Sequence, residues 1–543
     1  MQFLADLLSA LLNATIIGVA VLILVMAAQE SEQDGSLGAG QGPAPPVVVV
    51  AAGERPRRVI AHLFEWRWDD IAAECEAVLG PAGFAAVQVS PPNEHRVVAG
   101  GPWWQRYEPV SFALQSSSGG AEAFADMVRR CAAAGVAIYA DAVVNHMTGP
   151  PLADDPSWGV GSAGSRYDYY DYPGMLPGDF HTPRCALKGR YDDRVALQRC
   201  NVGGRADRNT DADRVQNRIG DYLNGLLDLG VAGLRIDAAR HMAAGDIAGI
   251  LARVRGLPFV YQAFASAPGA VVGERAYLGN GAVTELDYGR RLAVAFRRDS
   301  IAELQNLRPA GGADDLVPSR RAVVFVDSHE TRLESAAGEH TTFLGPADGA
   351  RYRLARLFML AWPYGTPRLL SGFTATDPDE GAPSGDAGTT LRVHGPHGLG
   401  CGEAWLCEHR HPAVLGMVGF ANAADGAEVA HWWDDGGGRI AFARGERAFV
   451  VINNTDAAMR QRLRTGLAAG RYCNVIAGRL LDGGCVGVTA QVDAAGGATV
   501  DGAQGDTQAM LEVTVGEDEH ADFEVPPRSA VAIHVGMGPA AGS

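Results

Sequence analysis

The 543-residue sequence predicts a (β/α)8 TIM barrel with a small subdomain inserted after the third strand and an all-β C-terminal domain. Eight short apolar segments alternate with stretches whose apolar residues recur at helical spacing, as in a parallel barrel surrounded by helices. A long segment without strands interrupts this alternation after the third apolar segment. Near the C-terminus, short strands with Gly-rich turns replace it, which indicates a separate all-β domain.

The expected barrel strands follow one another from residue 58 to residue 371. They lie at residues 58–64, 84–90, 136–146, 231–240, 258–264, 282–288, 322–330 and 366–371. Between them, stretches such as residues 121–135 and 213–230 have the apolar spacing of amphipathic helices. We therefore assign residues 57–146 and 207–427 to the barrel, 147–206 to the inserted subdomain and 428–543 to the C-terminal domain.

The N-terminal segment predicts export. Residues 14–28 form an apolar run that ends in small residues, and this length suits a signal-peptide core better than a full membrane span. No Lys or Arg precedes the run, and extension back to Leu7 gives enough length for an uncleaved anchor. Residues 1–29 are thus a signal peptide or an anchor, and residues 30–56, rich in Gly, Pro and Ala, are a disordered linker. We expect a secreted protein, or alternatively a membrane-anchored one with its domains outside.

The net charge indicates which binding partners to expect, and the cysteine content indicates the cellular compartment. The formal net charge is -17, which argues against nucleic acid and acidic lipid and favours a neutral substrate. The eight cysteines include no C-x-x-C pair, so a zinc site is not expected. Four disulfides in an oxidising compartment fit this even count, and the alternative is eight unpaired cysteines in a cytosolic protein.

Polar and charged residues gather where the predicted strands end. They are Asp141, Asn145, His146, Arg235, Asp237, His241, Glu285, Asp327, His329 and Glu330. In a barrel, the carboxyl ends of the strands carry the active site. Asp237 lies on the same strand face as Arg235, two residues earlier, and a neighbouring guanidinium keeps a carboxyl ionised, as a nucleophile requires. A structural ion pair is the alternative for these two residues alone.

At this point residues 59–535 resemble a known family, the α-amylase family of glycoside hydrolases (family 13), and specifically its animal-type, chloride-dependent members. The matching runs include HLFEWRWDDIAAECE, GFAAVQVSPPNE, PWWQRYEPVSF, YADAVVNHM, GLRIDAARHM, FVDSHE and WLCEHR. The resemblance implies retaining hydrolysis of internal α-1,4 bonds in starch-like or glycogen-like glucans, and we expect a monomer. It also implies the disulfide pairs Cys75–Cys131, Cys185–Cys200, Cys401–Cys407 and Cys473–Cys485.

The resemblance also assigns site residues. Asp237 corresponds to the nucleophile, and Glu330 corresponds to the carboxyl that holds the sugar hydroxyls. The residues expected to bind substrate are Trp103, Trp104, Tyr107, Asp141, His146, Arg235, Arg240, His241 and His329.

Two positions depart from the family pattern. The fifth-strand motif should end Gln-Glu, with the Glu as general acid, but here it reads Gln262-Ala263. A methyl group cannot donate a proton, and general acid–base catalysis typically supplies ~10²–10⁴-fold. The seventh-strand motif should end His-Asp but reads His329-Glu330, and a carboxylate displaced by about 1 Å can lose ~10²-fold in rate. Glu274 is a candidate for a replacement acid.

Two ion sites are implied by the resemblance. A structural Ca²⁺ would be held by Asn145, Asp207 and the backbone carbonyl of His241, with another carbonyl near Gln198. Chloride would lie near Arg235, Arg368 and Ser328, and Ser328 stands where the family has Asn. At residues 334–340 the family has a Gly-rich loop that carries a substrate-contacting His. This sequence replaces that loop, so we expect the contact to be lost.

Three functions therefore stay open. The chain is an α-amylase-type glycosidase with impaired turnover, a catalytically inactive α-glucan-binding homologue, or a membrane-anchored amylase-like scaffold. Ala263 argues against the first, and the aromatic residues at 103, 104 and 107 argue against the third.

Overall fold

A computed structural model describes most of the chain beyond the predicted linker. The described residues are 57–537 without 153–157, 257, 266–269, 308–315, 337–341, 386–387, 396–397, 482–483, 488, 493–497 and 502–509. The predicted signal peptide or anchor, the linker and part of the loop 334–340 lie outside the described residues. In the part of the chain that is described, no helix is long and apolar enough to cross a membrane.

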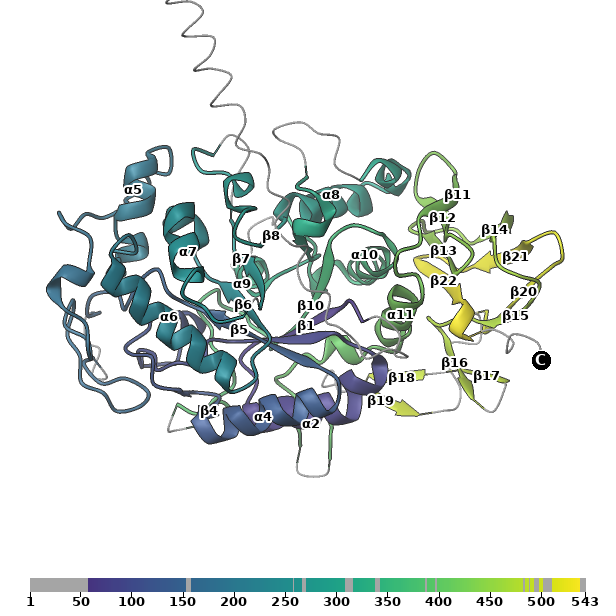
Figure 1. Cartoon of the computed structure of the whole chain (residues 1–543). Helices are drawn as coiled ribbons and strands as arrows, with labels where there is room; N and C mark the ends of the chain where they lie inside the picture. The colour runs from purple at the N-terminus through teal and green to yellow at the C-terminus, as the bar shows by residue number, and fades with distance from the viewer. Residues whose placement is uncertain are drawn as a thin grey trace, which may run out of the picture. The chain divides into compact units, whose positions relative to one another are not determined.

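Eight parallel strands form a closed barrel at the centre of the fold (Figure 1). The strands are β1 (Ile60–Leu63), β2 (Ala86–Val89), β5 (Ala137–Ala142), β6 (Gly233–Ile236), β7 (Phe259–Gln262), β8 (Ala282–Thr284), β9 (Ala322–Val324) and β10 (Thr366–Ser371). Each hydrogen-bonds to the next in chain order, and β10 closes on β1. The predicted barrel is confirmed, and all eight predicted segments contain one of its strands.

Several strands are shorter than the sequence indicated. The segment 282–288 ends as a strand at Thr284, and the segment 322–330 ends as a strand at Val324. Helices begin soon afterwards, at Leu286 and at His329. At this rim the Glu285 amide still donates to the Val323 carbonyl of β9 at 2.9 Å, while its carboxylate accepts from the amide of Asp287 at the start of α8.

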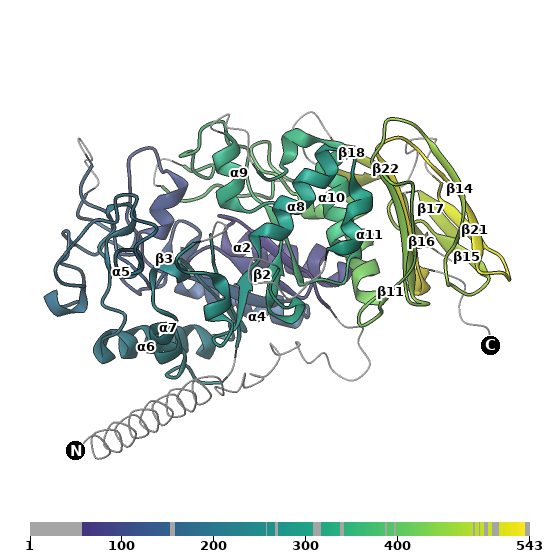
Figure 2. The ribbon, with the colours of Figure 1, turned by 90° about the horizontal axis from the view of Figure 1, so that it is seen from above.

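Helices surround the barrel (Figure 2). They are α2 (Trp68–Glu74), α3 (Gly80–Ala82), α4 (Ala121–Ala133), α6 (Asp213–Asp228), α7 (Ala244–Leu251), α8 (Leu286–Arg297), α9 (His329–Ala336), α10 (Ala350–Ala361) and α11 (Pro412–Ala423). In α6 the buried residues Val215, Ile219, Leu223 and Leu226 recur every three or four positions, so one apolar stripe faces the strands. Two-residue strands β3 (Gln115–Ser116) and β4 (Gly119–Gly120) pair before α4.

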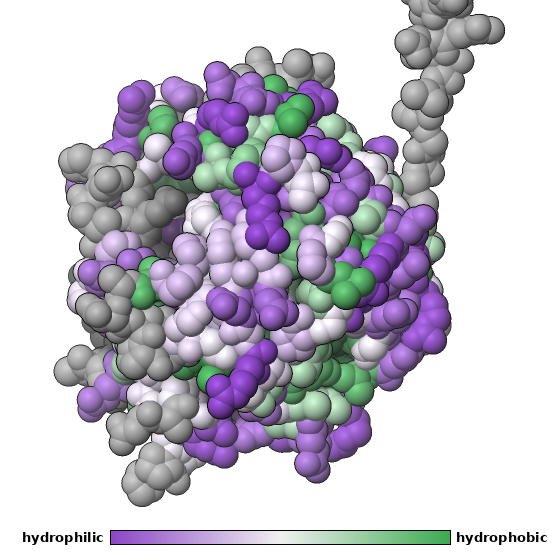
Figure 3. Space-filling view, turned by 90° about the vertical axis from the view of Figure 1, so that its left-hand side faces the viewer, coloured by the Kyte–Doolittle hydropathy of each residue, from purple (hydrophilic) through white to green (hydrophobic). Residues whose placement is uncertain are grey.

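The segment between β5 and α6 protrudes from the barrel and contains the short helix α5 (Arg194–Arg199). A small aromatic and apolar cluster fills it, and this cluster consists of Val110, Met147, Tyr167, Tyr172, Phe180 and Ala206. Hydrophilic and intermediate residues cover most of the face seen in Figure 3, and apolar residues gather mainly toward its lower right. The segment therefore has a small apolar core, which it shares with Val110 from the chain before β5.

Beyond α11 the chain forms antiparallel sheets. A four-stranded sheet has the order β11 (Val429–Asp434), β12 (Arg439–Arg444), β13 (Ala448–Asn453) and β22 (Ser529–His534). Four strand pairs accompany it: β14 (Met459–Arg464) with β21 (His520–Val525), β15 (Gly470–Cys473) with β20 (Glu512–Val515), β16 (Gly478–Leu481) with β17 (Gly484–Gly487), and β18 (Thr489–Val492) with β19 (Ala498–Asp501). A second apolar core, which includes Phe449, Val451 and Phe523, lies among these strands.

Arg444 of β12 joins the C-terminal domain to the barrel helices. Its buried guanidinium donates to the carbonyl of Ala361 at 2.6 Å and to that of Ala424 at 3.1 Å. A third acceptor is the Ala427 carbonyl at 2.8 Å. The last carbonyls of a helix have no partner within the helix, and Arg444 satisfies such groups at the ends of α10 and α11.

The four disulfides expected from the family resemblance are all present. They join Cys75 to Cys131, Cys185 to Cys200, Cys401 to Cys407 and Cys473 to Cys485. The first links α4 to the short π-helix Cys75–Leu79 that follows α2, and the second lies in the protruding segment.

Candidate active site

A cavity of about 740 Å³ opens at the carboxyl ends of the barrel strands. Its size lies within the range of about 300–1,000 Å³ that is typical of ligand sites. The predicted site residues that line it are Trp103, Trp104, Tyr107, His146, Arg235, Asp237, Arg240, His241, Ser328, His329, Glu330 and Arg368. The barrel thus brings together side chains that lie up to 265 positions apart, between 103 and 368.

Arg235 is the centre of an ionic cluster on the cavity floor. Its Nη1 atom lies 2.6 and 2.7 Å from the two carboxylate oxygens of Asp141, and 2.9 Å from Oδ1 of Asp237. Its Nη2 atom lies 3.5 Å from Oε1 of Glu330. Three acids, from β5, from the end of β6 and from the first turn of α9, therefore share one guanidinium, and Asp237 and Glu330 line the cavity.

Asp141 lies deeper than we expected for a substrate-binding residue. It is fully buried and is absent from the cavity lining, while the Tyr107 hydroxyl donates to its Oδ2 at 3.0 Å. Burial raises the pKa of Asp141 to about 6, against the opposing effect of Arg235 and with a further contribution from the charge of Asp237. Asp141 thus supports Arg235 from below.

His329 is held between two aromatic rings. Its imidazole stacks on Phe64 with ring centroids 4.7 Å apart and on Tyr107 at 5.4 Å. Burial, together with the charges of Arg235 and Arg368, keeps the pKa of His329 well below its usual value, so the ring is neutral. A neutral, oriented imidazole can donate a hydrogen bond to a sugar hydroxyl. Glu330, the next residue, has a half-exposed side chain in the cavity.

Aromatic and polar side chains form the remaining walls. The indole of Trp103 donates to the Pro378 carbonyl at 2.8 Å, and that of Trp104 donates to Asp379 Oδ1 at 3.1 Å. His146 Nε2 bonds to the Tyr107 carbonyl at 3.0 Å. These bonds fix the ring planes, and flat aromatic surfaces with polar groups between them suit a sugar chain.

Arg240 and His241 follow Asp237 closely in the sequence and line the same cavity. His241 Nδ1 bonds to the Leu197 carbonyl at 3.0 Å, and the Arg240 guanidinium lies 5.2 Å from the ring centre of Tyr191. Burial lowers the pKa of His241 to about 4, so this imidazole is also neutral at physiological pH. Tyr191 was not predicted as a site residue, because a single Tyr in the protruding segment has no distinguishing pattern.

Ala263 lies beside the nucleophile candidate. In the parallel pair β6–β7, Ile236 is opposite Gln262, so Asp237 and Ala263 follow at adjacent strand ends. Ala263 lines the cavity, and its amide donates to the Ile236 carbonyl at 2.9 Å. Glu274 begins a separate 3₁₀ turn, Glu274–Tyr277, and is not among the described residues that line the cavity. Nor is Glu285, whose carboxylate caps α8.

The predicted calcium ligands meet at the base of the protruding segment. Asn145 Nδ2 lies 3.3 Å from Asp207 Oδ1, and Oδ1 of Asn145 is buried without a partner among the described residues. Burial raises the pKa of Asp207 to about 6, partly offset by the hydrogen bond with His181. Gln198 lies near the third ligand, since its Nε2 donates to the Met242 carbonyl at 3.4 Å. An orphaned amide oxygen beside a buried carboxyl fits a hard cation.

The predicted chloride residues meet in the cavity. The Nε atoms of Arg235 and Arg368 are both buried without a partner among the described residues. Arg368 Nη1 donates to Gln88 Oε1 at 3.0 Å, while the Ser328 hydroxyl accepts from the Thr331 amide at 3.3 Å. Two buried guanidinium groups with unused donors fit a small anion.

Some supporting residues escaped sequence reasoning. Below the cavity, Gln88 Nε2 lies 3.2 Å from His62 Nε2, and the Tyr261 hydroxyl donates to Gln88 Oε1 at 2.5 Å. The only signal in the sequence that could have identified these residues is that they are polar residues inside otherwise apolar strands. Behind His329, Arg332 Nε donates to Asp327 Oδ2 at 3.0 Å, and its Nη1 donates to Glu408 Oε2 at 2.7 Å.

The chain is similar to known proteins over most of its length. Residues 432–536 match the C-terminal all-β domain of α-amylases. An α-amylase of Tenebrio molitor is 40% identical over 474 residues, which cover 84% of this chain and 97% of that protein. Pancreatic α-amylase 2a5 of Mus musculus is 39% identical over 465 residues, which cover 81% of this chain and 90% of that protein.

Solved structures of an α-amylase also match this chain over most of its length. The crystal structure of α-amylase I from Eisenia fetida is 35% identical and matches with a TM-score of 0.76, covering 88% of this chain and 97% of that one. A complex of a variant of the same Eisenia fetida enzyme with maltohexaose matches with a TM-score of 0.77, at the same identity and coverage.

Proposed function

Because the chain belongs to the α-amylase family of glycoside hydrolases, we propose that it acts on internal α-1,4 bonds of starch-like or glycogen-like glucans by a retaining mechanism. We further propose that its turnover is impaired at the proton-transfer step. The observation that carries this proposal is the pair at adjacent strand ends, where Asp237 is bound to Arg235 while the neighbouring position is Ala263. The cavity thus keeps a nucleophile and lacks a carboxyl at the position of the acid.

In the first step, a carboxylate oxygen of Asp237 attacks the anomeric carbon, and the bond from that carbon to the glycosidic oxygen breaks. Water then attacks the glycosyl ester and releases Asp237, so that two inversions give retention. Arg235 orients the carboxylate of Asp237 for the attack through their hydrogen bond, and His329 and Glu330 bind hydroxyls of the sugar at the cleavage site. The departing oxygen requires a proton, and a methyl group at residue 263 cannot supply it.

Two ions complete the proposed site. Asn145, Asp207 and the carbonyl of His241 would hold Ca²⁺, which supplies a structural link between the barrel and the protruding segment. Arg235, Arg368 and Ser328 would hold chloride, which supplies negative charge on the cavity floor and raises the pKa of a neighbouring carboxyl. Without an acid at residue 263, chloride has no proton donor to tune there, so we expect little activation by chloride.

A substrate with a reactive leaving group tests the proposal. Fluoride departs from α-maltosyl fluoride without protonation, whereas the alcohol of a starch chain does not. We expect the protein to release fluoride at a readily measured rate but to release reducing sugar from soluble starch at least ~10²-fold more slowly. Asp237→Asn, which keeps the shape of the side chain and removes the nucleophile, is the control and should lose both activities. Equal rates on the two substrates would show that another group donates the proton.

The same substitution at residue 263 favours a second function, a catalytically inactive α-glucan-binding protein. Tight binding of maltohexaose without turnover of either substrate would establish it. Loss of both maltohexaose binding and turnover would instead favour the third function, a membrane-anchored scaffold.

We also propose that the protein is secreted, with the membrane-anchored form as the alternative. The four disulfides support an oxidising compartment. N-terminal sequencing of protein recovered from the culture medium tests this proposal, because a cleaved signal peptide leaves a new N-terminus near residue 30.

A further inference from the structure

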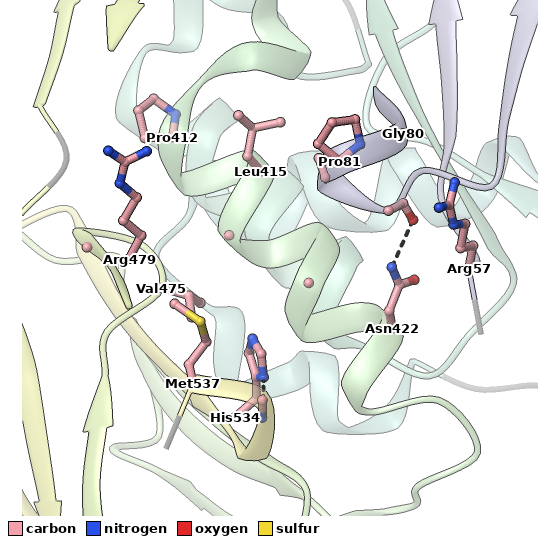
Figure 4. Close-up of a pocket in the computed structure, with 16 residues that line it drawn as sticks. Arg57, Gly80, Pro81, Pro412, Leu415, Asn422, Val475, Arg479, His534 and Met537 are labelled. Atoms are coloured by element: carbon pink, nitrogen blue, oxygen red, sulfur yellow. Dashed lines mark hydrogen bonds between the residues drawn. The ribbon is translucent and has the colours of Figure 1, made fainter. Parts of the chain in front are cut away.

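A second cavity, of about 530 Å³, lies at the junction of the barrel helices and the C-terminal domain (Figure 4). The barrel side contributes Arg57, the α3 turn from Gly80 to Gly83 and α11, and the C-terminal domain contributes Val475, Gly478, Arg479, His534, Gly536 and Met537. Among the residues that the structure describes, this cavity shares no lining residue with the candidate active site.

One face of α11 forms the cavity wall. Its lining residues are Pro412, Leu415, Gly416, Gly419 and Asn422, which recur at the three- and four-residue spacing of a helix face. From Pro412 to Asn422 the helix extends for about 15 Å, so the cavity is elongated. Proline, leucine and glycine on this face, with Val475 and Met537 opposite, make the wall largely apolar. Such a wall favours an elongated apolar body.

The charged lining residues all have the same sign. Arg57 and Arg479 line the cavity, and none of the described lining residues is Asp or Glu, although the whole chain has a net charge of -17. In Figure 4 the two guanidinium groups lie toward opposite ends of the α11 face, Arg479 on the side of Pro412 and Arg57 on the side of Asn422.

The two arginines differ in the hydrogen bonds that they make within the protein. Arg57 donates through Nη1 to the carbonyls of Phe84 and Gly135, at 3.4 and 2.5 Å. Arg479 has an exposed side chain and no hydrogen-bond or ion-pair partner among the described residues. Arg479 is therefore the cation that can pair with a ligand without losing an existing contact.

From these observations we infer that this cavity is a binding site for an amphipathic carboxylate, a molecule with an aliphatic chain and one anionic end. The chain lies along α11, and the carboxylate pairs with Arg479. A second glucan chain does not fit, because the lining residues that the structure describes include no Trp, Tyr or Phe face for a sugar ring and no carboxylate for its hydroxyls. The ligand contacts both domains, so its binding stabilises their junction.

Two variants separate the apolar and ionic parts of the site. Arg479→Gln removes the charge from an exposed side chain and leaves the fold intact. Gly419→Leu puts an isobutyl group into the cavity. A Cβ at residue 419 has no neighbour closer than His534 Nε2 at 3.5 Å, and leucine is a better helix former than glycine. Gly416 is unsuitable, because a Cβ there would lie 1.9 Å from the Val475 carbonyl oxygen. Arg471→Gln, an exposed arginine of the same domain outside the cavity, is the matched control.

The test is calorimetric binding of dodecanoate to the full chain, below the micellar concentration and with maltohexaose at saturation. We expect binding that raises the unfolding temperature, that Arg479→Gln weakens about three- to tenfold and that Arg471→Gln leaves unchanged. Gly419→Leu should abolish it. Dodecanol, which lacks the charge, should bind the native protein and Arg479→Gln equally. Binding that survives both cavity variants, that maltohexaose displaces, or that is as strong for dodecanol as for dodecanoate would overturn the inference.

Discussion

The Nη1 atom of Arg235 lies 2.9 Å from Oδ1 of Asp237, two residues further along the same strand end. The same nitrogen also contacts both carboxylate oxygens of Asp141 from beneath. Arginine suits this position because its planar fork presents several donors and stays charged when buried. The orientation of Asp237 therefore depends on Arg235, which the buried Asp141 holds in place.

Restoring a carboxyl beside Asp237 should restore starch hydrolysis. We expect Ala263→Glu to raise the rate of reducing-sugar release from soluble starch by ~10²–10⁴-fold, because the new side chain can protonate the departing oxygen. The rate on α-maltosyl fluoride should change far less. Ala263→Gln has nearly the same volume without a transferable proton, so an equal gain in both variants would contradict this explanation.

Calcium should stabilise the protein through Asp207. With free Ca²⁺ at a hundred times its Kd, we expect the free energy of unfolding to rise by about 2.7 kcal/mol, and a chelator should remove this gain. Asp207→Asn should unfold at the same denaturant concentration with and without Ca²⁺. Asp211→Asn, which alters an exposed carboxylate nearby that pairs with Arg199, should keep the full response. A calcium response that persists in Asp207→Asn would place the ion elsewhere.

Glu285 should make the protein less stable as the pH rises. Burial raises the pKa of this carboxyl to about 7, although the amides of Val317 and Asp287 donate to it. The folded state then holds a proton that the unfolded state releases near pH 4.5, so this contribution to stability is present at low pH and lost between about pH 4.5 and 7. The full change is about 3 kcal/mol.

Glu285→Gln removes this titration. The difference in unfolding free energy between the variant and the native protein, measured by denaturant titration from pH 4.5 to 7.5, should shift in favour of the variant by a few kcal/mol. A difference that stays constant with pH would contradict the raised pKa of Glu285.

Glu74 of α2 should be far more important to stability than its exposed neighbour. Its buried carboxylate accepts from His409 Nε2 and Arg410 Nε, both at 2.7 Å. We expect Glu74→Gln to lower the free energy of unfolding by about 3–5 kcal/mol, because the variant leaves Arg410 buried without its counter-charge. Glu76→Gln, two residues away and half-exposed, is the control and should change it by less than about 1 kcal/mol.

The pH dependence of Glu74 has the opposite sign to that of Glu285. Burial alone would raise the pKa of Glu74, but hydrogen bonds with His394, His409 and Arg410 lower it far below the usual range. Its contribution is therefore complete above about pH 4.5 and is lost as the pH falls further. Acid titration of unfolding should show the native protein losing its advantage over Glu74→Gln below that pH.

The barrel was predictable because each strand is a short apolar run with its own boundaries. The segment 366–371, for example, became β10 without change. The positions of Asp237 and Ala263 at neighbouring strand ends followed from their motifs. The depth of Asp141 did not, because alternation along a strand distinguishes inward from outward and says nothing of height within a barrel.

The networks that hold the site in place were beyond sequence reasoning for another reason. Glu74 and Arg410 are 336 positions apart, and Arg332 and Glu408 are 76 apart. Each of these residues alone has the pattern of an ordinary helix or loop residue. The pairing of these acidic and basic side chains is determined only when the closed barrel brings α2, α9 and residues 408–410 together.

The hydrogen bonds of Arg444 to three carbonyls have a consequence for how this protein can be divided. The ends of α10 and α11 receive donors from a strand of the C-terminal domain. A fragment that stops at residue 427 would keep every barrel strand and expose these carbonyls, along with the apolar surface around them. We therefore expect the C-terminal domain to support the folding of the barrel, so that the fragment that ends at residue 427 should give insoluble protein when it is expressed by itself.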